Sequence, residues 1–452
     1  MAQAKQDMGS GSVKKLMLQL MIPAVVAQVV NLLYNIVDRI YIGHIAGIGA
    51  AALTGVGLFT PILMLLNAFA MLVGAGGAPR TAIALGQGDR QRAEKIISNS
   101  FTVLMLFAVV LTIGFYAGAP ALLRLFGASD ATLPYALSYS RIYILGSVFV
   151  LLVLGMNPFI TTQGFAKTSM LTTVIGAVIN IILDPILIFG FGLGVRGAAI
   201  ATVIGQWVSG IMVIIFNLKF NPEVQLHKKY LPLEGKTVAA ILTVGIPSIV
   251  MNGIGSVMNF GINQILQGFA ETATGVFGVY FKLQSFFFMP LFGLNNATIS
   301  IIAYNYGARK PQRITKTLKI SCTAALCLMT VGLLVFQFFP DVLLGMFNPS
   351  QAFLEIGRVA LRTISWSFPI AAICIALGAS FQALGNGIYS TIVSLCRQLV
   401  VLLPVAYLLS LTGEVQRVWL AFPIAEVVSG TVTFICFTRI YRQKIKPLFE
   451  QA

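Results

Sequence analysis

Charged residues are scarce in this sequence: they make up 10% of its 452 residues, whereas 57% are hydrophobic. Soluble domains carry about a quarter charged residues, so the composition excludes a water-soluble globule. Acidic residues are the scarcer sign, with 14 Asp and Glu against 30 Lys and Arg and a net charge of +16. The basic residues lie in short runs between long apolar stretches, so the surplus indicates membrane topology and not nucleic-acid binding.

Residues suited to metal binding or nucleophilic catalysis are few as well. The only histidines are His44 and His227, and the five cysteines form an odd set, in or beside apolar stretches, without metal-site spacing. A glycine-rich phosphate-binding loop is missing. These absences disfavour an enzyme, a disulfide framework and a bound cofactor. A membrane-embedded enzyme stays open as an alternative only through the pair of aspartates described below.

Twelve apolar runs are long enough to cross a bilayer as helices, which takes about twenty residues. They predict an all-α integral membrane protein with 12 transmembrane helices. The runs lie near residues 16–42, 50–78, 97–118, 135–161, 169–191, 197–217, 239–266, 273–303, 318–340, 357–382, 388–411 and 417–438.

Every second connection between these runs is basic. The positive-inside rule therefore places both termini in the cytoplasm and predicts a multi-pass protein of the cytoplasmic (inner) membrane. An even number of spans agrees with this orientation. The basic connections contain Lys5, Lys14 and Lys15; Arg80, Arg90, Arg92 and Lys95; Lys167; Lys219, Lys228, Lys229 and Lys236; Arg309, Lys310, Arg313, Lys316 and Lys319; and Arg439, Arg442, Lys444 and Lys446.

The two halves of the sequence repeat one another at an offset of 220 to 225 residues. IPAVVAQVVNLLYNIVDRIYIG matches IPSIVMNGIGSVMNFGINQILQG, which pairs Pro23 with Pro247. Six spans per repeat is an even number, so both copies run in the same direction, as in transporters that alternate access between two lobes. We expect two pseudo-symmetric six-helix lobes, residues 1–217 and 237–452, joined by a cytoplasmic linker at 218–236.

Ionisable residues inside a span are costly, so by default they mark a transport pathway or a coupling site. Of the acids, only Asp38, Asp184 and Glu426 lie well inside the runs. Polar residues also recur every three or four positions in the first, fifth and sixth runs, which places them on one face of each helix. With a rise of about 1.5 Å per residue, Asp38, Asp184 and Thr202 lie at similar depths. We expect the three stripes to face one another; they are Gln28, Asn31, Asn35 and Asp38; Asn180 and Asp184; and Thr202, Gln206 and Ser209.

This cluster predicts coupling to a cation. Two carboxylates in a poorly solvated site retain a proton or bind a cation. Oxygen ligands from Asp38, Asn180, Asp184 and Thr202 would suit sodium. Hydrogen bonding between neighbouring helices is the alternative role for neutral residues such as Gln206.

The second repeat has no carboxylate on the equivalent face, where Asn259 stands. Glu426 aligns with Gln206 of the first repeat and lies near the middle of its span. A second site at Glu426 and Asn259, for a proton or a charged substrate, is one hypothesis. Pairing of Glu426 with Arg397 in a structural role is the other.

Three segments carry a resemblance to a known family: IPAVVAQVVNLLYNIVDRIYIGHIAG, NIILDPILIFGFGLGVRGAAIAT and IAYNYGARK. Over nearly its whole length the chain resembles the multidrug and toxin extrusion (MATE) transporters. It is most similar to the bacterial and archaeal members whose N-terminal lobe carries an acidic cluster. The resemblance implies two six-helix lobes in a V with a cavity between them, and export of organic cations in exchange for sodium or protons.

The resemblance also implies residue roles. The family's first-helix proline, which bends when the cluster changes state, falls on Pro23, and a pocket tyrosine falls on Tyr139. The branch with acids in its seventh and tenth spans is not matched, because Asn259 stands in the seventh and the tenth has none. The family's cation site falls on Asp38, Asn180, Asp184 and Thr202.

We therefore expect a monomeric multidrug efflux antiporter that exports organic, mostly cationic, compounds in exchange for protons or sodium by alternating access. Its partners would be the lipid bilayer and small organic cations, and its coupling ion would be cargo, not a cofactor. A lipid-linked precursor flippase of the same superfamily is the alternative. A flippase would need basic residues along its cavity for pyrophosphate, whereas the deep cluster here is acidic.

Overall fold

The computed structural model describes residues 7–269, 271–347 and 350–450; Lys5 lies outside them. Helices and short connections account for this part of the chain, and no β-strand occurs in it. A helix satisfies its own backbone hydrogen bonds, which a segment within lipid must do. The predicted all-α fold class is confirmed.

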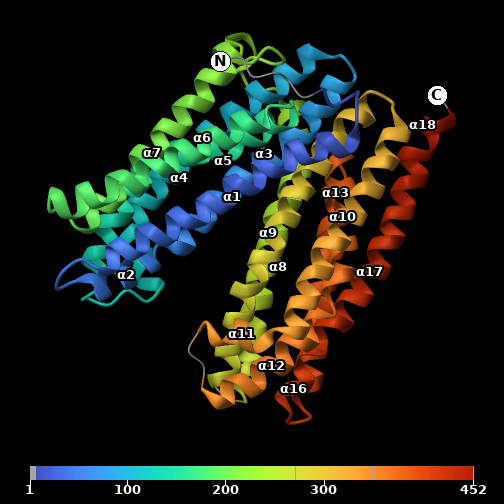
Figure 1. The fold of residues 1–452 in the computed structure, drawn as a ribbon. Coiled ribbons are helices and arrows are strands. Elements are labelled where there is room, and N and C mark those ends of the chain that lie inside the picture. Colours follow the sequence, from blue (N-terminus) through green and yellow to red (C-terminus); the bar gives the residue numbers. More distant parts are fainter. Residues whose placement is uncertain (1–6, 270, 348–349, 451–452) are drawn as a thin grey trace. The chain divides into compact units, whose positions relative to one another are not determined.

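The described chain divides into two compact units, the first formed by Ile22–Gly245 with Asp7. Its helices run in sequence order from blue to green in Figure 1. They are most of α1 (Val13–Gly43), α2 (Gly49–Gly57), α3 (Thr60–Gly86), α4 (Arg90–Leu125), α5 (Leu133–Thr162), α6 (Ala166–Pro185), the π-helical turn η1 (Ile186–Gly190), α7 (Val195–Ile215), the π-helical turn η2 (Phe216–Phe220), the 3₁₀ turn η3 (Lys228–Tyr230) and the start of α8 (Gly235–Gln267).

The second unit is formed by Met8–Met21 and by the described residues from Ile246 onward. Within it, α13 packs against α9, α10 and α17. After the rest of α8 its elements are α9 (Glu271–Gly307), α10 (Pro311–Phe338), α11 (Pro340–Gly345), α12 (Gln351–Ser365), α13 (Phe368–Ala383), α14 (Gly387–Leu395), the π-helical η4 (Cys396–Leu402), α15 (Leu403–Ser410), α16 (Val415–Val418), α17 (Ala421–Ile440), the π-helical η5 (Tyr441–Ile445) and α18 (Lys446–Glu450).

Eleven helices within the described ranges are long and apolar enough to cross a membrane. A twelfth span is the pair α12 and α13, which bend by 45° at a short break. This agrees with the twelve predicted spans. The second span is also interrupted, because Leu58 and Phe59 separate α2 from α3.

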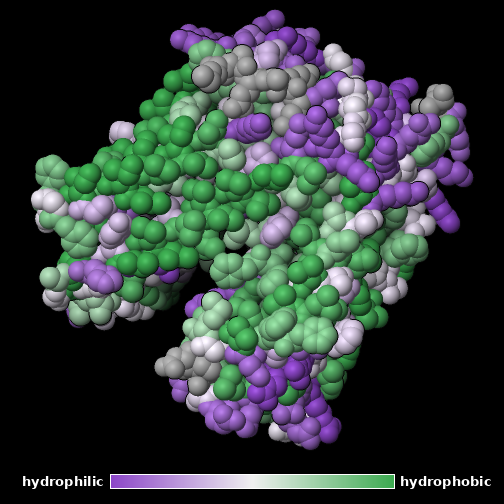
Figure 2. Space-filling view, in the orientation of Figure 1, coloured by the Kyte–Doolittle hydropathy of each residue, from purple (hydrophilic) through white to green (hydrophobic). Residues whose placement is uncertain are grey.

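Large apolar side chains are exposed along the helices, as expected for surfaces solvated by lipid. On α4, for example, Leu106, Val109, Val110 and Ile113 are all exposed. Figure 2 shows hydrophobic residues along the visible sides of α1 and α7, and hydrophilic residues gathered at the helix ends. The protein is a multi-pass membrane protein.

The border between the two compact units falls inside two helices. Helix α1 passes from the second unit to the first between Met21 and Ile22, and α8 passes from the first to the second between Gly245 and Ile246. Pro23 and Pro247 lie within these helices, and each is the second residue after the border. The predicted division has other boundaries, with lobes at 1–217 and 237–452 and a linker at 218–236. It stays a prediction.

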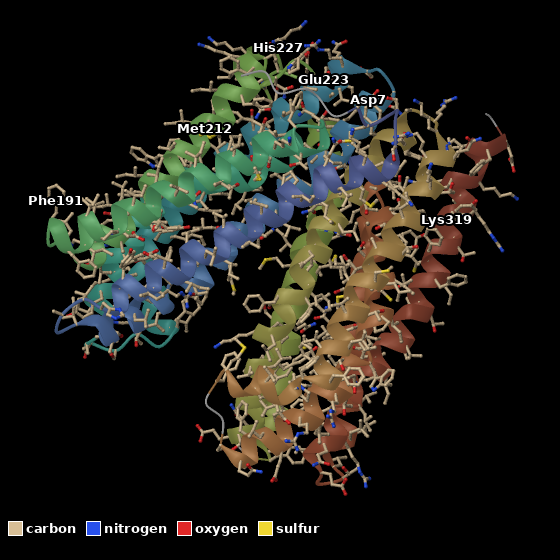
Figure 3. The ribbon with its side chains drawn as sticks, in the orientation of Figure 1. Asp7, Phe191, Met212, Glu223, His227 and Lys319 are labelled. Atoms are coloured by element: carbon tan, nitrogen blue, oxygen red, sulfur yellow. The ribbon has the colours of Figure 1, made fainter. Side chains whose placement is uncertain are left out.

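The connection between α7 and α8 is held against α4 in the first unit. The amide of Asn99 donates to the Tyr230 carbonyl at 3.0 Å, and its oxygen accepts from the Glu234 backbone at 2.8 Å. In Figure 3 His227 and Glu223, in this connection, lie at one end of the unit and Phe191 lies at the other, with Met212 between them. The α6–α7 turn is therefore at the end of the unit opposite this connection.

Candidate functional site

Two glycines let α6 and α7 approach each other closely. A Cβ on Gly176 would collide with the Ser209 hydroxyl and lie 2.6 Å from the Gly205 carbonyl oxygen. A Cβ on Gly205 would lie 2.5 Å from the carbonyl oxygen of Gly176. Small residues at a helix interface permit this kind of backbone contact in membranes. The contact sets the spacing of the polar residues one turn away, which are Asn180 after Gly176 on α6 and Thr202 before Gly205 on α7.

Those polar residues form a hydrogen-bonded set. Asn180 lies four residues after Gly176, and its amide donates to Asp184 Oδ1 and to Thr202 Oγ1, both at 3.2 Å. Thr202 Oγ1 donates in turn to the Ala198 carbonyl at 3.0 Å. All three side chains are buried, and Asp184 has no exposed surface. The structure therefore brings the predicted fifth-span and sixth-span residues together.

Asp184 occupies the end of a regular helix. Pro185 follows it directly and closes α6, and the chain continues as the π-helical turn η1. Proline has no N–H to donate, and π-helical turns are frequent at functional sites. Gly197 at the start of α7 packs on this turn, because a Cβ there would lie 2.7 Å from the Leu187 carbonyl. The backbone around the carboxylate is thus irregular and closely packed.

Asp38 reaches the same region from α1. Its side chain is buried, with 7% of the residue exposed, and its charge acts on Asp184. Of the polar stripe on α1, Asp38 is the member buried at the residues of α6 and α7, whereas Gln28 and Asn35 are exposed. Two carboxyl groups within each other's field favour a shared proton or a bound cation over two bare charges.

Three oxygen atoms in this cluster are buried without a hydrogen-bond partner among the described residues. They are Asp38 Oδ1, Asp184 Oδ2 and Asn180 Oδ1. An unsatisfied buried oxygen costs about 1–3 kcal/mol, more if it is charged. A bound ion is one explanation for an unsatisfied buried polar group in a native structure. Hard oxygen donors suit a small hard cation, and a carboxyl oxygen can instead accept a proton.

Tyrosines border the cluster, and two of them were not among its predicted members. Tyr139, on α5, lies near Thr202 and within the field of Asp38. Tyr143 stacks on Tyr139 with ring centroids 5.9 Å apart, and Tyr34 lies near Gln206 and both carboxylates. Spacing offered a signal for both: Tyr143 is four residues after Tyr139, and Tyr34 is four residues before Asp38.

The other predicted first-lobe residues are less directly involved. Asn35 is exposed, and its amide donates to the Asn31 carbonyl on its own helix at 2.7 Å. Gln206 is half-buried beside Tyr34. Pro23 is buried within α1. Their predicted roles in coupling and conformational change stay predictions.

The predicted second-site residues lie on different helices of the second unit. Glu426, on α17, pairs through Oε1 with Arg397 Nη1 at 3.2 Å, while its Oε2 is buried and unpartnered within the described chain. Asn259, on α8, donates to the Gly255 carbonyl of its own helix at 3.2 Å. Glu426 thus forms the ion pair with Arg397 that the structural alternative predicted. A second site at Glu426 and Asn259 stays a hypothesis.

A duplicated set of membrane-spanning helices with a pair of carboxylates buried in the first repeat is typical of membrane transporters. The family model MatE matches residues 23–186 and again residues 247–408. The chain therefore belongs to the MatE family, whose members are transporters and not enzymes. The two matches begin 224 residues apart, at Pro23 and Pro247, which confirms the internal repeat.

Similar proteins cover almost the whole chain. The multidrug export protein MepA of Staphylococcus saprophyticus is 25% identical over 97% of this chain and 97% of its own length. An FAD transporter of Shewanella oneidensis is 25% identical over 95% of this chain and 96% of its own. Among solved structures, the outward-facing conformation of a multidrug resistance MATE family transporter of the MOP superfamily matches with a TM-score of 0.88 at 25% identity, over 99% of this chain and 100% of that one.

Proposed function

We propose that this protein is a multidrug efflux antiporter that exports organic, mostly cationic, compounds in exchange for protons or sodium by alternating access. The observation that carries the proposal is the buried cluster of Asp38 and Asp184 with its three unpartnered oxygens. Similarity to the multidrug export protein MepA supports the substrate class. The coupling ion is cargo, and the proposal includes no other cofactor.

The cluster would act through its affinity for the ion in two states of the transporter. A ligand shifts a conformational equilibrium only by its differential affinity for the two states. Ion binding from the outer side would satisfy the orphaned oxygens and favour the inward-facing state. Release of the ion inward would then accompany loading of the drug. Asn180 would position the cation, since it contacts both Asp184 and Thr202.

The membrane placement belongs to the same proposal. Basic residues in every second connection support a cytoplasmic membrane location with both termini in the cytoplasm. A monomer is the simplest unit, because the repeat already supplies two lobes from one chain.

The test is efflux of a fluorescent cationic dye from energised vesicles, with proton and sodium gradients imposed separately. We expect Asp38→Asn and Asp184→Asn to abolish export driven by the coupling gradient. Asp130→Asn is the matched control, because the Asp130 side chain is 91% exposed and pairs with the surface residue Arg124. Full export by Asp38→Asn would contradict the proposed coupling.

The same vesicles test the alternatives. If wild-type protein moves no dye under either gradient, transport of a lipid-linked precursor becomes the better hypothesis, and labelled lipid is assayed next. FAD is included as a competitor, because one similar protein is an FAD transporter. Inhibition of dye export by FAD would indicate that an anionic dinucleotide binds to the transporter, and uptake of labelled FAD would then test whether it is carried.

A further inference from the structure

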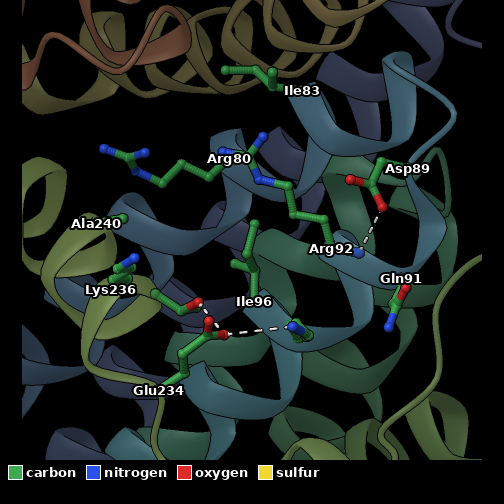
Figure 4. A pocket seen from close by; sticks show the side chains of 11 residues that line it. Arg80, Ile83, Asp89, Gln91, Arg92, Ile96, Glu234, Lys236 and Ala240 are labelled. Carbon is green, nitrogen blue, oxygen red and sulfur yellow. Dashed lines mark hydrogen bonds and ion pairs between the residues drawn. The ribbon is translucent and has the colours of Figure 1, made fainter.

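A basic pocket lies in the first unit, away from the acidic cluster. Its volume is about 420 Å³, and it lies between the end of α3, the start of α4 and the start of α8. Figure 4 shows Arg80 and Arg92 extending into it, with Lys236 on the side formed by α8. This volume is in the range of small-ligand sites.

The charges of the pocket are unbalanced. Its lining includes four cations, Arg80, Arg92, Lys95 and Lys236, against the two carboxylates of Asp89 and Glu234. Glu234 Oε2 accepts from Thr237 at 2.9 Å and lies 3.9 Å from Lys95 Nζ. Asp89 accepts from the backbone N–H of Arg92 at 2.9 Å as the N-cap of α4. Both carboxylates thus have partners already, and two positive charges remain in excess.

Arg80 is the residue that points to a ligand. Its Nε is buried and has no hydrogen-bond partner within the described part of the chain. Its side chain also lies within the field of the Arg92 guanidinium, so two like charges face the same space. Like charges close together are unfavourable, and a buried N–H without an acceptor costs about 1–3 kcal/mol. An anion bound between the two arginines would remove both costs.

Two helix N-termini add to the positive potential. Helix α4 begins at Arg90 and α8 at Gly235, so their first turns border the pocket. The helix dipole favours anions at such ends, although Asp89 already accepts the Arg92 N–H of α4. Arginine forks bind tetrahedral phosphate oxygens through paired hydrogen bonds, whereas lysine acts as a point charge.

We propose that this pocket binds a phosphate group, held by Arg80 and Arg92 and supported by Lys95 and Lys236. The pocket lies where α3 ends, and the basic residues around it place this end at the cytoplasmic membrane surface. Basic pockets between helices at that surface bind anionic lipid headgroups. A phospholipid headgroup and a free phosphate share the chemistry, and the test separates them.

Binding would also tie α8 to the first unit. Lys236 belongs to the first turn of α8, whereas Arg80 and Arg92 belong to α3 and α4. A phosphate bridging these helices would hold the start of α8, which continues beyond Gly245 into the second unit. The site would thus hold the segment of α8 that leads to the border after Gly245.

The experiment uses the full chain purified in a neutral maltoside detergent. Dioctanoyl phosphatidylglycerol, dioctanoyl phosphatidylcholine and inorganic phosphate are titrated separately, and Kd is measured from the shift in melting temperature. The test variant is Arg80→Gln with Arg92→Gln. The control is Lys316→Gln with Lys319→Gln, which removes the same charge from two exposed positions of α10.

We expect an anionic probe to bind the wild type and the control with Kd values within about twofold, and the test variant at least about tenfold more weakly. Binding of phosphatidylglycerol alone identifies a lipid site, and equal binding of inorganic phosphate identifies a soluble phosphate site. The proposal is overturned if neither phosphatidylglycerol nor inorganic phosphate binds, or if the test and control variants lose affinity equally. If the double arginine variant does not fold, Lys95→Gln with Lys236→Gln at the rim replaces it, with a loss of about threefold or more expected. The assay needs no transport, so its outcome is independent of the antiport proposal.

Discussion

Replacing Gly176 with alanine should separate α6 from α7 and thereby weaken the proposed cation site. The added Cβ would lie 2.6 Å from the Gly205 carbonyl oxygen, whereas an ordinary contact is at least 3.4 Å. The helices must therefore move apart by about 0.8 Å at this point, since a backbone carbonyl cannot rotate away. The Ser209 hydroxyl is also in the way, and its bond to the Thr172 carbonyl at 2.7 Å holds it there.

The same movement reaches Asn180 and Thr202, whose hydrogen bond is already 3.2 Å long. A further 0.8 Å takes it to about 4 Å, beyond the range of a hydrogen bond. We expect an overpacking cost of about 1–3 kcal/mol in unfolding free energy and roughly tenfold weaker binding of the coupling ion.

The assay combines thermal unfolding in detergent with ion titration of gradient-driven dye export. Gly114→Ala is the control, because it makes the same change within a helix but its Cβ would have no neighbour within 4 Å. That control should leave ion affinity unchanged and stabilise the protein slightly, since alanine is the better helix former by about 1 kcal/mol. If Gly176→Ala keeps the affinity and melting temperature of the control, the close contact does not position the site.

Three further outcomes are expected. Thr202→Ala should lower the apparent affinity for the coupling ion severalfold, as measured by ion titration of dye export. Thr202→Ser should retain that affinity, because serine keeps the hydroxyl that accepts the hydrogen bond from α6. Arg313→Gln should speed hydrogen exchange across residues 8–12 at least about tenfold, because Arg313 donates to three backbone carbonyls of this segment at 2.8 to 3.2 Å; unchanged exchange would refute the clamp. Glu426→Gln and Arg397→Gln should each lower the free energy of unfolding by about 1–3 kcal/mol, and the double variant should lower it by less than the sum. If the two losses are strictly additive in urea titrations, the pair is not coupled.

The spans and the facing stripes could be predicted because both depend on local periodicity. Apolar length predicts a span, and polar residues at intervals of three or four predict a common helix face. Asn180 and Asp184 illustrate this, since one turn of helix is enough to bring them into contact. Thr202 could be added because depth along the span is also a local quantity.

Features that depend on packing between helices could not be predicted in this way. The contact between Gly176 and Gly205 is invisible to hydropathy, because glycine appears throughout membrane helices for many reasons. Spacing places Tyr34 and Tyr143 on the faces of Asp38 and Tyr139, but their nearness to the carboxylates depends on how α1 and α5 pack in the first unit. The borders of the compact units inside α1 and α8 also follow from tertiary packing and not from any break in the apolar runs.

The borders between the compact units show where the chain would have to bend if one unit moved against the other. Within the described residues the chain passes between the units at only three points, after Asp7, after Met21 and after Gly245. Any rearrangement of one unit against the other must be absorbed there. Two of the three points lie inside helices that would resist bending, and in each a proline is the second residue after the border. Proline removes one helical hydrogen bond and so lowers the cost of bending at that place. Because Asp38 lies on the α1 segment beyond Pro23, the proposed ion binding at the cluster and any bending of α1 would act on the same helix, which would give the proposed coupling a direct structural route.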